Sequence, residues 1–170
     1  SGARSARTLP RHPKIDTAIF DLTLSSVVEE GLYSNHTSVA VIAKPLDDGP
    51  KAQDDLKPEI ISRVHRLLVD VADSAVVLSA DNPLCGEVAG PNGSKDICIV
   101  ANGEEDEVAR KFISAGHAVV VKAVRNGKAM IIVHAGGNTG PPTEINPMTP
   151  TVGDLWIEAA MYAVALCHVL

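Results

Sequence analysis

Polar side chains follow a short apolar run near the beginning of the chain, in the stretch DTAIFDLTLSSVVEEGL from Asp16 to Leu32. The run itself, Thr17–Phe20, contains β-branched residues and predicts a buried strand. Asp21 ends this run, and Thr23 and two serines follow in a polar turn. A carboxylate and hydroxyls just past the carboxyl end of a strand face the crevice where an open α/β sheet usually binds ligands. Asp21 is therefore a candidate metal ligand, with a helix cap or a turn acceptor as the alternative.

Aspartates and histidines elsewhere could also bind a metal ion. Asp47 and Asp48 lie in the breaker-rich stretch KPLDDGP, where a metal site at Asp48 competes with a solvated turn. His65 falls on the polar side of an expected helix, where a surface histidine is the simpler interpretation. His117 and His134 lie at the outer ends of a predicted hairpin, and we expect them to pair across the strands without a metal.

A glycine-rich segment, Gly136–Gly140, has the composition of a phosphate-binding loop. It lacks the lysine of such a loop and does not lead directly into a helix. A flexible linker is therefore the favoured interpretation.

The composition limits the class of protein. The 170 residues suffice for one domain, whose core must be aliphatic because aromatic residues make up only 3%. A net charge of −6 argues against a nucleic-acid partner. No apolar run approaches the ~18 residues of a membrane span, and Ser1–Pro10 lacks the hydrophobic stretch of a signal peptide. Cys85, Cys98 and Cys167 lie far apart, which predicts buried free thiols in a cytoplasmic protein.

Alternating apolar runs and an amphipathic segment predict an α/β fold with a mostly parallel sheet flanked by helices. Strands are expected over Ser38–Ala43, Ser74–Ser79 and Ile97–Ala101. Between the first two, Asp55–Val71 carries apolar residues at helical spacing, with Pro58 where a first helical turn tolerates proline.

The second half of the chain adds an antiparallel hairpin to this sheet. After a helix expected over Glu104–Ala115, strands His117–Val124 and Lys128–His134 flank an Asn-Gly pair, which is a strong hairpin signal. A Gly/Pro-rich linker, Ala135–Pro150, follows. The last element is an Ala-rich helix over Thr151–Leu170, with Thr151 as its expected cap.

Several short motifs occur along the chain in a recognisable order. HPKIDTAIFD is followed by EEGL, then by Leu78–Leu84 (LSADNPL) and by Ile145–Thr149 (INPMT) before the last helix. In this order and spacing the chain resembles the central, nucleotide-binding domain of the Mur-ligase superfamily, most closely the Mur-like half of cyanophycin synthetases. The resemblance covers nearly all of residues 1–170, as one domain without the family's phosphate-loop segment and its C-terminal substrate domain.

This resemblance implies an ATP-dependent amide ligase, in which ATP phosphorylates a carboxylate and an amine attacks the acyl phosphate. Cyanophycin synthetases join aspartate and arginine into a storage polymer, and their Mur-like half adds the arginine. The family's chemistry uses Mg²⁺ and ATP, with the phosphates held by a glycine-rich loop at a helix N-terminus. The pattern G-x-x-x-x-G-K-[ST] of that loop does not occur in this chain.

Positions that bind ATP and metal in the family carry other residues here. Asp21 replaces a glutamate, and the arginine and two glycines that follow it in the family are missing. Ala43 replaces an asparagine, and Asp48 replaces a metal-binding histidine. Trp156 and Ala159 stand at the places of adenine-contacting asparagines and cannot make the same hydrogen bonds.

These changes predict a degenerate Mur-ligase-like domain with a structural or oligomerisation role and no ATP, Mg²⁺ or other cofactor of its own. Asp21 and Asp48 remain the candidate metal ligands, without a confident catalytic or nucleotide-binding residue. Trp156 and Tyr162 are expected at an interface, either with the ATP-grasp domain of a cyanophycin-synthetase-like ligase or with a second copy. The alternative is a fragment of an active cyanophycin synthetase, which adds arginine to an aspartyl carboxylate when flanking segments are present.

Overall fold

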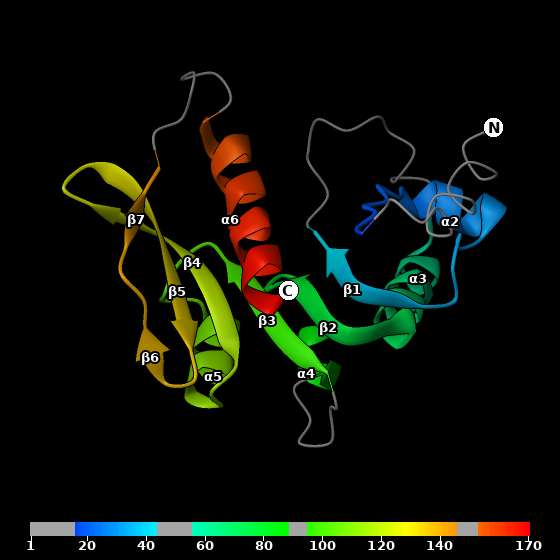
Figure 1. Ribbon diagram of the computed structural model, residues 1–170, viewed down its shortest axis with the longest axis horizontal. Coiled ribbons are helices and arrows are strands. Elements are labelled where there is room, and N and C mark those ends of the chain that lie inside the picture. The colour runs from blue at the N-terminus through cyan, green and yellow to red at the C-terminus, as the bar shows by residue number, and fades with distance from the viewer. Residues whose placement is uncertain (1–15, 44–55, 89–94, 146–152) are drawn as a thin grey trace.

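The residues that the structure describes form a mixed sheet of seven strands (Figure 1). The computed structural model describes residues 16–43, 56–88, 95–145 and 153–170. The strands are β1 Thr37–Ile42, β2 Ala72–Ser79, β3 Asp96–Ala101, β4 Ala118–Arg125, β5 Lys128–Ala135, β6 Asn138–Thr139 and β7 Thr143–Glu144. They lie in the order β1-β2-β3-β4-β5-β6, with β7 also paired with β5. Strands β1 to β4 are parallel and the others antiparallel, which confirms the predicted fold class.

Helices connect and cover the strands. They are α2 Leu24–Glu30, α3 Pro58–Val71, α4 Cys85–Val88, α5 Glu107–Ser114 and α6 Gly153–Val169. Pro58 occupies the first turn of α3, as its missing N–H allows. Asp106 accepts a hydrogen bond from the backbone of Ala109 and so caps α5, and Gly116 follows the helix at a φ of +83°. Helix α4 was not predicted.

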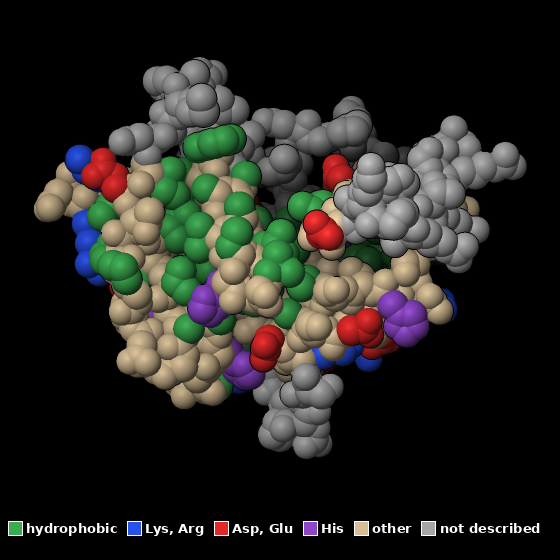
Figure 2. Space-filling model, in the orientation of Figure 1, with side chains coloured by type: hydrophobic (Ala, Val, Ile, Leu, Met, Phe, Trp, Pro, Cys, Tyr) green, Lys and Arg blue, Asp and Glu red, His purple; other side chains and the backbone are tan. Residues whose placement is uncertain are grey.

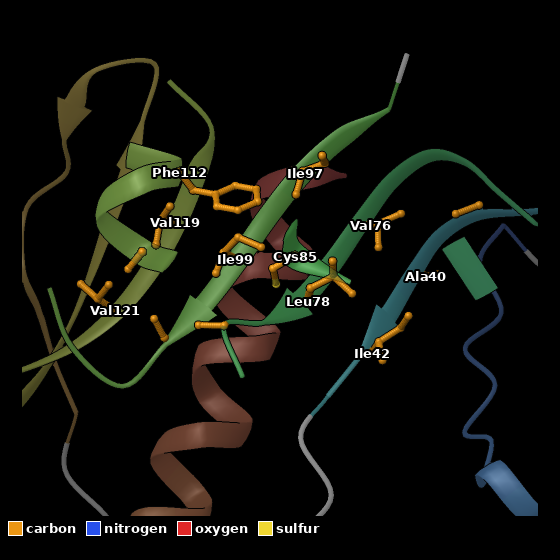
Figure 3. Packing of buried hydrophobic residues seen from close by; sticks show 14 of the residues in the cluster. Ala40, Ile42, Val76, Leu78, Cys85, Ile97, Ile99, Phe112, Val119 and Val121 are labelled. Atoms are coloured by element: carbon orange, nitrogen blue, oxygen red, sulfur yellow. The ribbon is translucent and has the colours of Figure 1, made fainter. Parts of the chain in front are cut away.

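One face of the sheet packs against α3 and α5. Leu78, Ile99 and Val121 point to this face from three neighbouring strands. In Figure 3 the ring of Phe112, from α5, lies over this layer, and Phe112 is almost completely buried. Side chains of α3 complete the cover at the β1–β2 end.

Among the described residues, α6 is the helix that packs against the opposite face. The helix places Ile157, Met161 and Ala165 against a second set of strand residues, Val77, Cys98, Val100, Val120 and Ile131. The strands therefore bury side chains on both faces, as parallel strands in α/β proteins do.

The hairpin forms where the sequence predicts it. Arg125 pairs with Lys128, and the two residues between them, Asn126 and Gly127, have φ values of 54° and 74°. Positive φ at both central positions is the requirement of the type I′ turn that matches strand twist.

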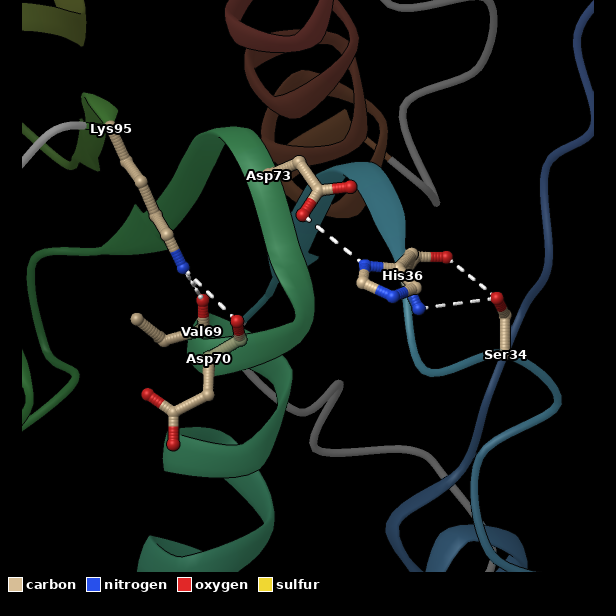
Figure 4. A network of polar contacts seen from close by, with 6 residues as sticks. All are labelled: Ser34, His36, Val69, Asp70, Asp73 and Lys95. Carbon is tan, nitrogen blue, oxygen red and sulfur yellow. Dashed lines mark hydrogen bonds and ion pairs between the residues drawn. The ribbon is translucent and has the colours of Figure 1, made fainter.

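Polar contacts bind the ends of α3 and β1 to the sheet (Figure 4). The Lys95 ammonium donates to the carbonyls of Val69 and Asp70, 2.6 Å and 3.2 Å away, and so satisfies two acceptors of the last turn of α3. His36 lies 3.5 Å from the Asp73 carboxylate, and the Ser34 hydroxyl donates to the carbonyl of His36. The first contact joins the residue before β3 to the end of α3, and the second joins the residue before β1 to β2.

Three predictions about local structure were wrong. Thr17–Phe20 is not a strand, and Ile19 is 81% exposed, because the segment has no neighbouring strand among the described residues. The polar turn after Asp21 is the start of α2. In the predicted linker, residues 138–139 and 143–144 form β6 and β7, because the edge of β5 offers backbone partners to both segments.

Replacing Phe112 with alanine tests how much the packing of α5 against the sheet contributes to the stability of the fold. Phe112→Ala should lower the free energy of unfolding by about 3–5 kcal/mol, since it leaves a cavity in a close-packed layer. Val124→Ala is the matched control: Val124 is 68% exposed, and its truncation should change stability by less than about 0.5 kcal/mol. Urea unfolding followed by circular dichroism measures both, and equal losses would contradict the assigned core.

Candidate functional site

The carboxyl ends of β2 and β3 carry the polar residues that an α/β sheet uses for ligand binding. Ser79 and Asp81 from one strand end, Asn102 from the next, and Glu158 and Tyr162 from α6 surround a small hollow. Its volume is about 10 Å³, roughly the room that one water molecule requires.

The turn after β2 is held by its own hydrogen bonds. The Asp81 amide donates to the Ser79 hydroxyl at 3.3 Å, and the Leu84 amide donates to the Asn82 side-chain oxygen at 3.0 Å. The Cys85 thiol lies 3.2 Å from the Ser79 carbonyl, at the start of α4. Asn82 is therefore a turn-forming residue, which accounts for its burial.

His65 contacts this turn from α3. Its Nδ1 lies 3.2 Å from the Asn82 side-chain nitrogen, so that the amide donates to the imidazole when Nδ1 is unprotonated. Burial lowers the pKa of His65 below its ordinary value of 6.5. The expectation of a plain surface histidine was wrong, because the turn after β2 covers one side of the ring.

A second polar cluster lies at the far end of β5. His134 is 8% exposed, its Nδ1 lies 3.0 Å from the Thr139 hydroxyl, and its Nε2 lies 3.2 Å from a Glu104 carboxylate oxygen. The Nε2–Glu104 contact does not have hydrogen-bond geometry, so it is an ion pair only when the imidazole is protonated. The cluster fastens β6 and the loop after β3 to β5.

The predicted pairing of His117 with His134 was wrong. Val119, not His117, lies opposite His134 in the hairpin. The ring of His117 instead packs against Phe112, with ring centroids 5.3 Å apart.

The structure describes one of the two candidate metal ligands. Asp21 is exposed, and the cap of α2 is Thr23, whose hydroxyl accepts from the Ser26 amide at 3.1 Å. Asp48 lies outside the described residues. Within the ranges that the structure describes, no three metal-ligating side chains cluster.

The two predicted interface residues lie on different sides of α6. Trp156 is 48% exposed and faces away from the sheet. Tyr162 is partly buried against the cluster of apolar residues between α6 and the sheet, and it borders the small hollow. Of the two, Trp156 is the side chain available to another protein.

Sequence reasoning missed an open apolar groove on the face of α6. It has a volume of about 470 Å³ and lies between α6 and the β5–β6 end of the sheet, lined among others by Val133, Ala135, Val164 and Cys167. The signal was present in the sequence: between Gly153 and Val169 the residues other than Asp154, Glu158 and His168 carry no charge, so α6 is apolar on nearly every side. Figure 2 shows hydrophobic side chains gathered over α6 and beside it.

Comparison with known proteins does not extend these observations. No protein-family model matches the chain, and no curated protein is significantly similar to it. Among the described residues, no helix is long and apolar enough to cross a membrane.

The lowered pKa of His65 predicts a dependence of stability on pH. The unfolded chain binds a proton near pH ~6.5 and the folded chain only at lower pH, so stability is full above ~6.5 and falls on acidification. His65→Gln, whose amide oxygen can still accept from Asn82, should flatten this fall between pH 7 and pH 5. Urea unfolding at several pH values measures the slopes, and equal slopes for wild type and His65→Gln would contradict the prediction.

The three thiols should react at different rates. Burial raises the pKa of Cys85 to about 11 and that of Cys98 to about 12, whereas Cys167 is exposed, contrary to the prediction of three buried thiols. Iodoacetamide at pH 8 should therefore add one label to the folded chain and three in denaturant, as counted by intact mass. Cys167→Ser should remove the single fast label. Rapid labelling of that variant in the folded state would show that a core thiol is accessible.

Proposed function

We propose that this chain is a non-catalytic docking module: a degenerate Mur-ligase-like domain with a structural or oligomerisation role in a cyanophycin-synthetase-like ligase, and without ATP chemistry of its own. The observation that carries the proposal is the exposed apolar face of α6. A helix that is apolar on all sides is normally buried on all sides. Among the described residues, the sheet packs against one side of α6, while Trp156, Ala159 and Ala163 on the other side are exposed.

The uncovered side of α6 has the composition of an interface core. Trp156 is half exposed at one end, an apolar groove opens at the other, and Ala159, Ala163 and Cys167 between them are exposed. Tryptophan in a setting free of charges is typical of the side chains that contribute most to protein–protein binding.

The edge of the sheet at which α/β proteins usually bind ligands supports the non-catalytic part of the proposal. The hollow at the ends of β2 and β3 has room for about one water. The two residues that replace adenine-contacting asparagines under the Mur-ligase resemblance, Trp156 and Ala159, are exposed on the outer side of α6 and do not line the hollow. An interface on the outer side of α6 would bury both side chains in their observed positions.

The proposed partner is an ATP-grasp domain of the same kind of ligase or a second copy of this chain. Either would bury the α6 face by apolar contact, so binding should persist in salt, which screens charge pairs but not hydrophobic contact.

The only tryptophan of the chain, Trp156, reports on this face directly. Raising the protein concentration, or adding a purified ATP-grasp domain, should shift its fluorescence to shorter wavelength as the indole leaves water. Ala159→Lys should abolish the shift, because it places an unpaired charge in an apolar contact.

Val124→Lys is the matched control, since Val124 is exposed on β4 rather than on α6. It should leave the fluorescence shift intact. A tryptophan emission that depends neither on concentration nor on the ATP-grasp domain, together with a monomeric mass in light scattering, would refute the docking proposal.

A further inference from the structure

Three polar side chains form a chain of contacts at the β5–β6 end of the sheet. The hydroxyl of Thr139, on β6, lies 3.0 Å from Nδ1 of His134, which is opposite it on β5. Nε2 of the same imidazole lies 3.2 Å from a carboxylate oxygen of Glu104, in the loop before α5. A hydroxyl, an imidazole and a carboxylate in this order are the groups that activate an oxygen nucleophile.

We infer that Thr139 is an acceptor site for an acyl group, with His134 as its general base and Glu104 as the positioning residue that faces the imidazole. The donor is an activated carboxylic acid derivative, such as a thioester. The site goes beyond the docking function proposed above and does not depend on it. Side chains alternate along a strand, so His134 shares the face of Ile132, which packs on the side of α5 and not of α6.

The three side chains differ in exposure as this chemistry requires. Thr139 is exposed, so a donor can reach its hydroxyl. His134 is buried, which holds its ring in one place with Nδ1 on the threonine oxygen. Glu104 lies on the other side of the ring and is itself exposed. The nucleophile is therefore the accessible end of a fixed base.

Nε2 of His134 has no hydrogen-bond partner among the described residues, and its contact with Glu104 lacks hydrogen-bond geometry. A buried polar atom without a partner is unfavourable. The atom gains an ionic partner when the imidazole is protonated. Transfer of the Thr139 proton to Nδ1 creates that charged ring, so the carboxylate stabilises the state in which the threonine oxygen is nucleophilic.

The backbone of β6 offers a donor for the charge that develops on the acyl oxygen. The two-residue turn of Gly136 and Gly137, both at positive φ, sets the register of β6 on β5. In this register the Gly140 amide donates to the Val133 carbonyl at 2.7 Å. Because hydrogen-bonded and non-hydrogen-bonded pairs alternate, the amide of Thr139 points away from β5. It can therefore donate to the oxyanion that forms beside Oγ1.

Contacts within the loop before α5 fix the position of Glu104. The Asp106 amide donates to the Gly103 carbonyl at 3.3 Å, and the Arg110 side chain donates to the Glu105 carbonyl at 3.1 Å. The residues on both sides of Glu104 are therefore anchored at the start of α5, so its carboxylate needs little rearrangement to meet a charged imidazole.

The charge of the cluster selects the class of donor. The charged side chain in contact with His134 is a carboxylate, which repels an anionic donor such as an acyl phosphate or a phosphate ester. A thioester or an oxygen ester has an uncharged carbonyl group and meets no such repulsion. Phosphoryl transfer relies on cations that neutralise the phosphate oxygens. Acyl transfer from an uncharged donor therefore fits this cluster better.

The step requires no reactant besides the donor. Oγ1 of Thr139 bonds to the carbonyl carbon of the donor, and its proton passes to Nδ1 of His134. The bond between that carbon and the leaving sulfur or oxygen then breaks. The leaving group takes the proton from the imidazolium, and Thr139 carries an ester.

Acetylation of the full chain by p-nitrophenyl acetate tests the site. A Cys167→Ser background removes the exposed thiol. Peptide mass mapping should find an ester on Thr139 that hydroxylamine removes, whereas acetyl amides on lysines resist it. Thr143 is the matched control residue, because it is exposed on β7 and lies opposite Ile131 rather than a histidine. It should stay unmodified.

Variants separate the three roles. Thr139→Ser should keep the ester, and Thr139→Val, which has the same branched shape, should lose it. His134→Gln should slow labelling of residue 139 at least about 100-fold, while the lysines of the same sample react as before and so report an intact fold. Glu104→Gln keeps the shape but not the charge and should slow labelling at least about tenfold. Glu104→Asp should recover part of that rate, because it restores the charge.

Other outcomes overturn the inference. Acetylated lysines without an ester on Thr139, or equal labelling of Thr139 and Thr143, would show that the contacts activate no nucleophile. An unchanged rate in His134→Gln would show that the imidazole is not the base. The ratio of Thr139 label to lysine label should be lower with acetyl phosphate than with the uncharged ester, and an equal ratio would overturn the class of donor. None of these results changes the docking proposal, which the emission of Trp156 tests.

Discussion

The structure depends on the need to cover both faces of a parallel sheet. Strands β1 to β4 are apolar on both sides, and their side chains form two separate clusters, one on each face. On one face α3 and α5 together shield residues such as Leu78 and Val121 from water. On the other, α6 is the helix among the described residues that covers Val77, Cys98 and Val120. One helix is about 10 Å wide and spans about two strands, which are each about 4.8 Å apart.

The unequal cover explains why apolar surface remains on the α6 side. Val41 of β1 is partly exposed at one margin, and the groove along β5 opens at the other. The apolar outer side of α6 adds to this surface. Because burial of apolar area is the main favourable term in association, a second protein on this face would complete the cover that the chain begins. The polar hollow at the strand ends is small by comparison, and α6 residues close it.

Local signals predicted most of the fold. The Asn126-Gly127 pair determines a turn by its own backbone preferences, and it formed as expected. The apolar runs of β2 and β3 are buried on both sides and so were recognisable without knowledge of their neighbours. By contrast, Thr17–Phe20 has a strand-like composition, but a strand forms only with a partner edge, which the sequence of the segment does not contain. Strands β6 and β7 were missed for the converse reason, since the edge of β5 creates them.

The candidate site was predicted less well than the fold. Trp156 was expected at an interface and is exposed, but the groove that lies at the other end of its helix depends on the separation of α6 from β5, which no local pattern encodes. The contact of His65 with Asn82 likewise joins residues 17 positions apart through the packing of α3. The sequence therefore did not predict which distant elements pack together.

Isothermal titration of the full chain with Mg-ATP decides whether this domain contributes protein contacts, as we propose, or nucleotide chemistry. The proposal predicts no saturable heat up to millimolar nucleotide, at protein concentrations where the Trp156 emission already reports association. Saturable binding with a dissociation constant in the micromolar range, lost in Asp21→Ala, would contradict it, because the acidic residue after the first apolar run would then serve a working nucleotide site.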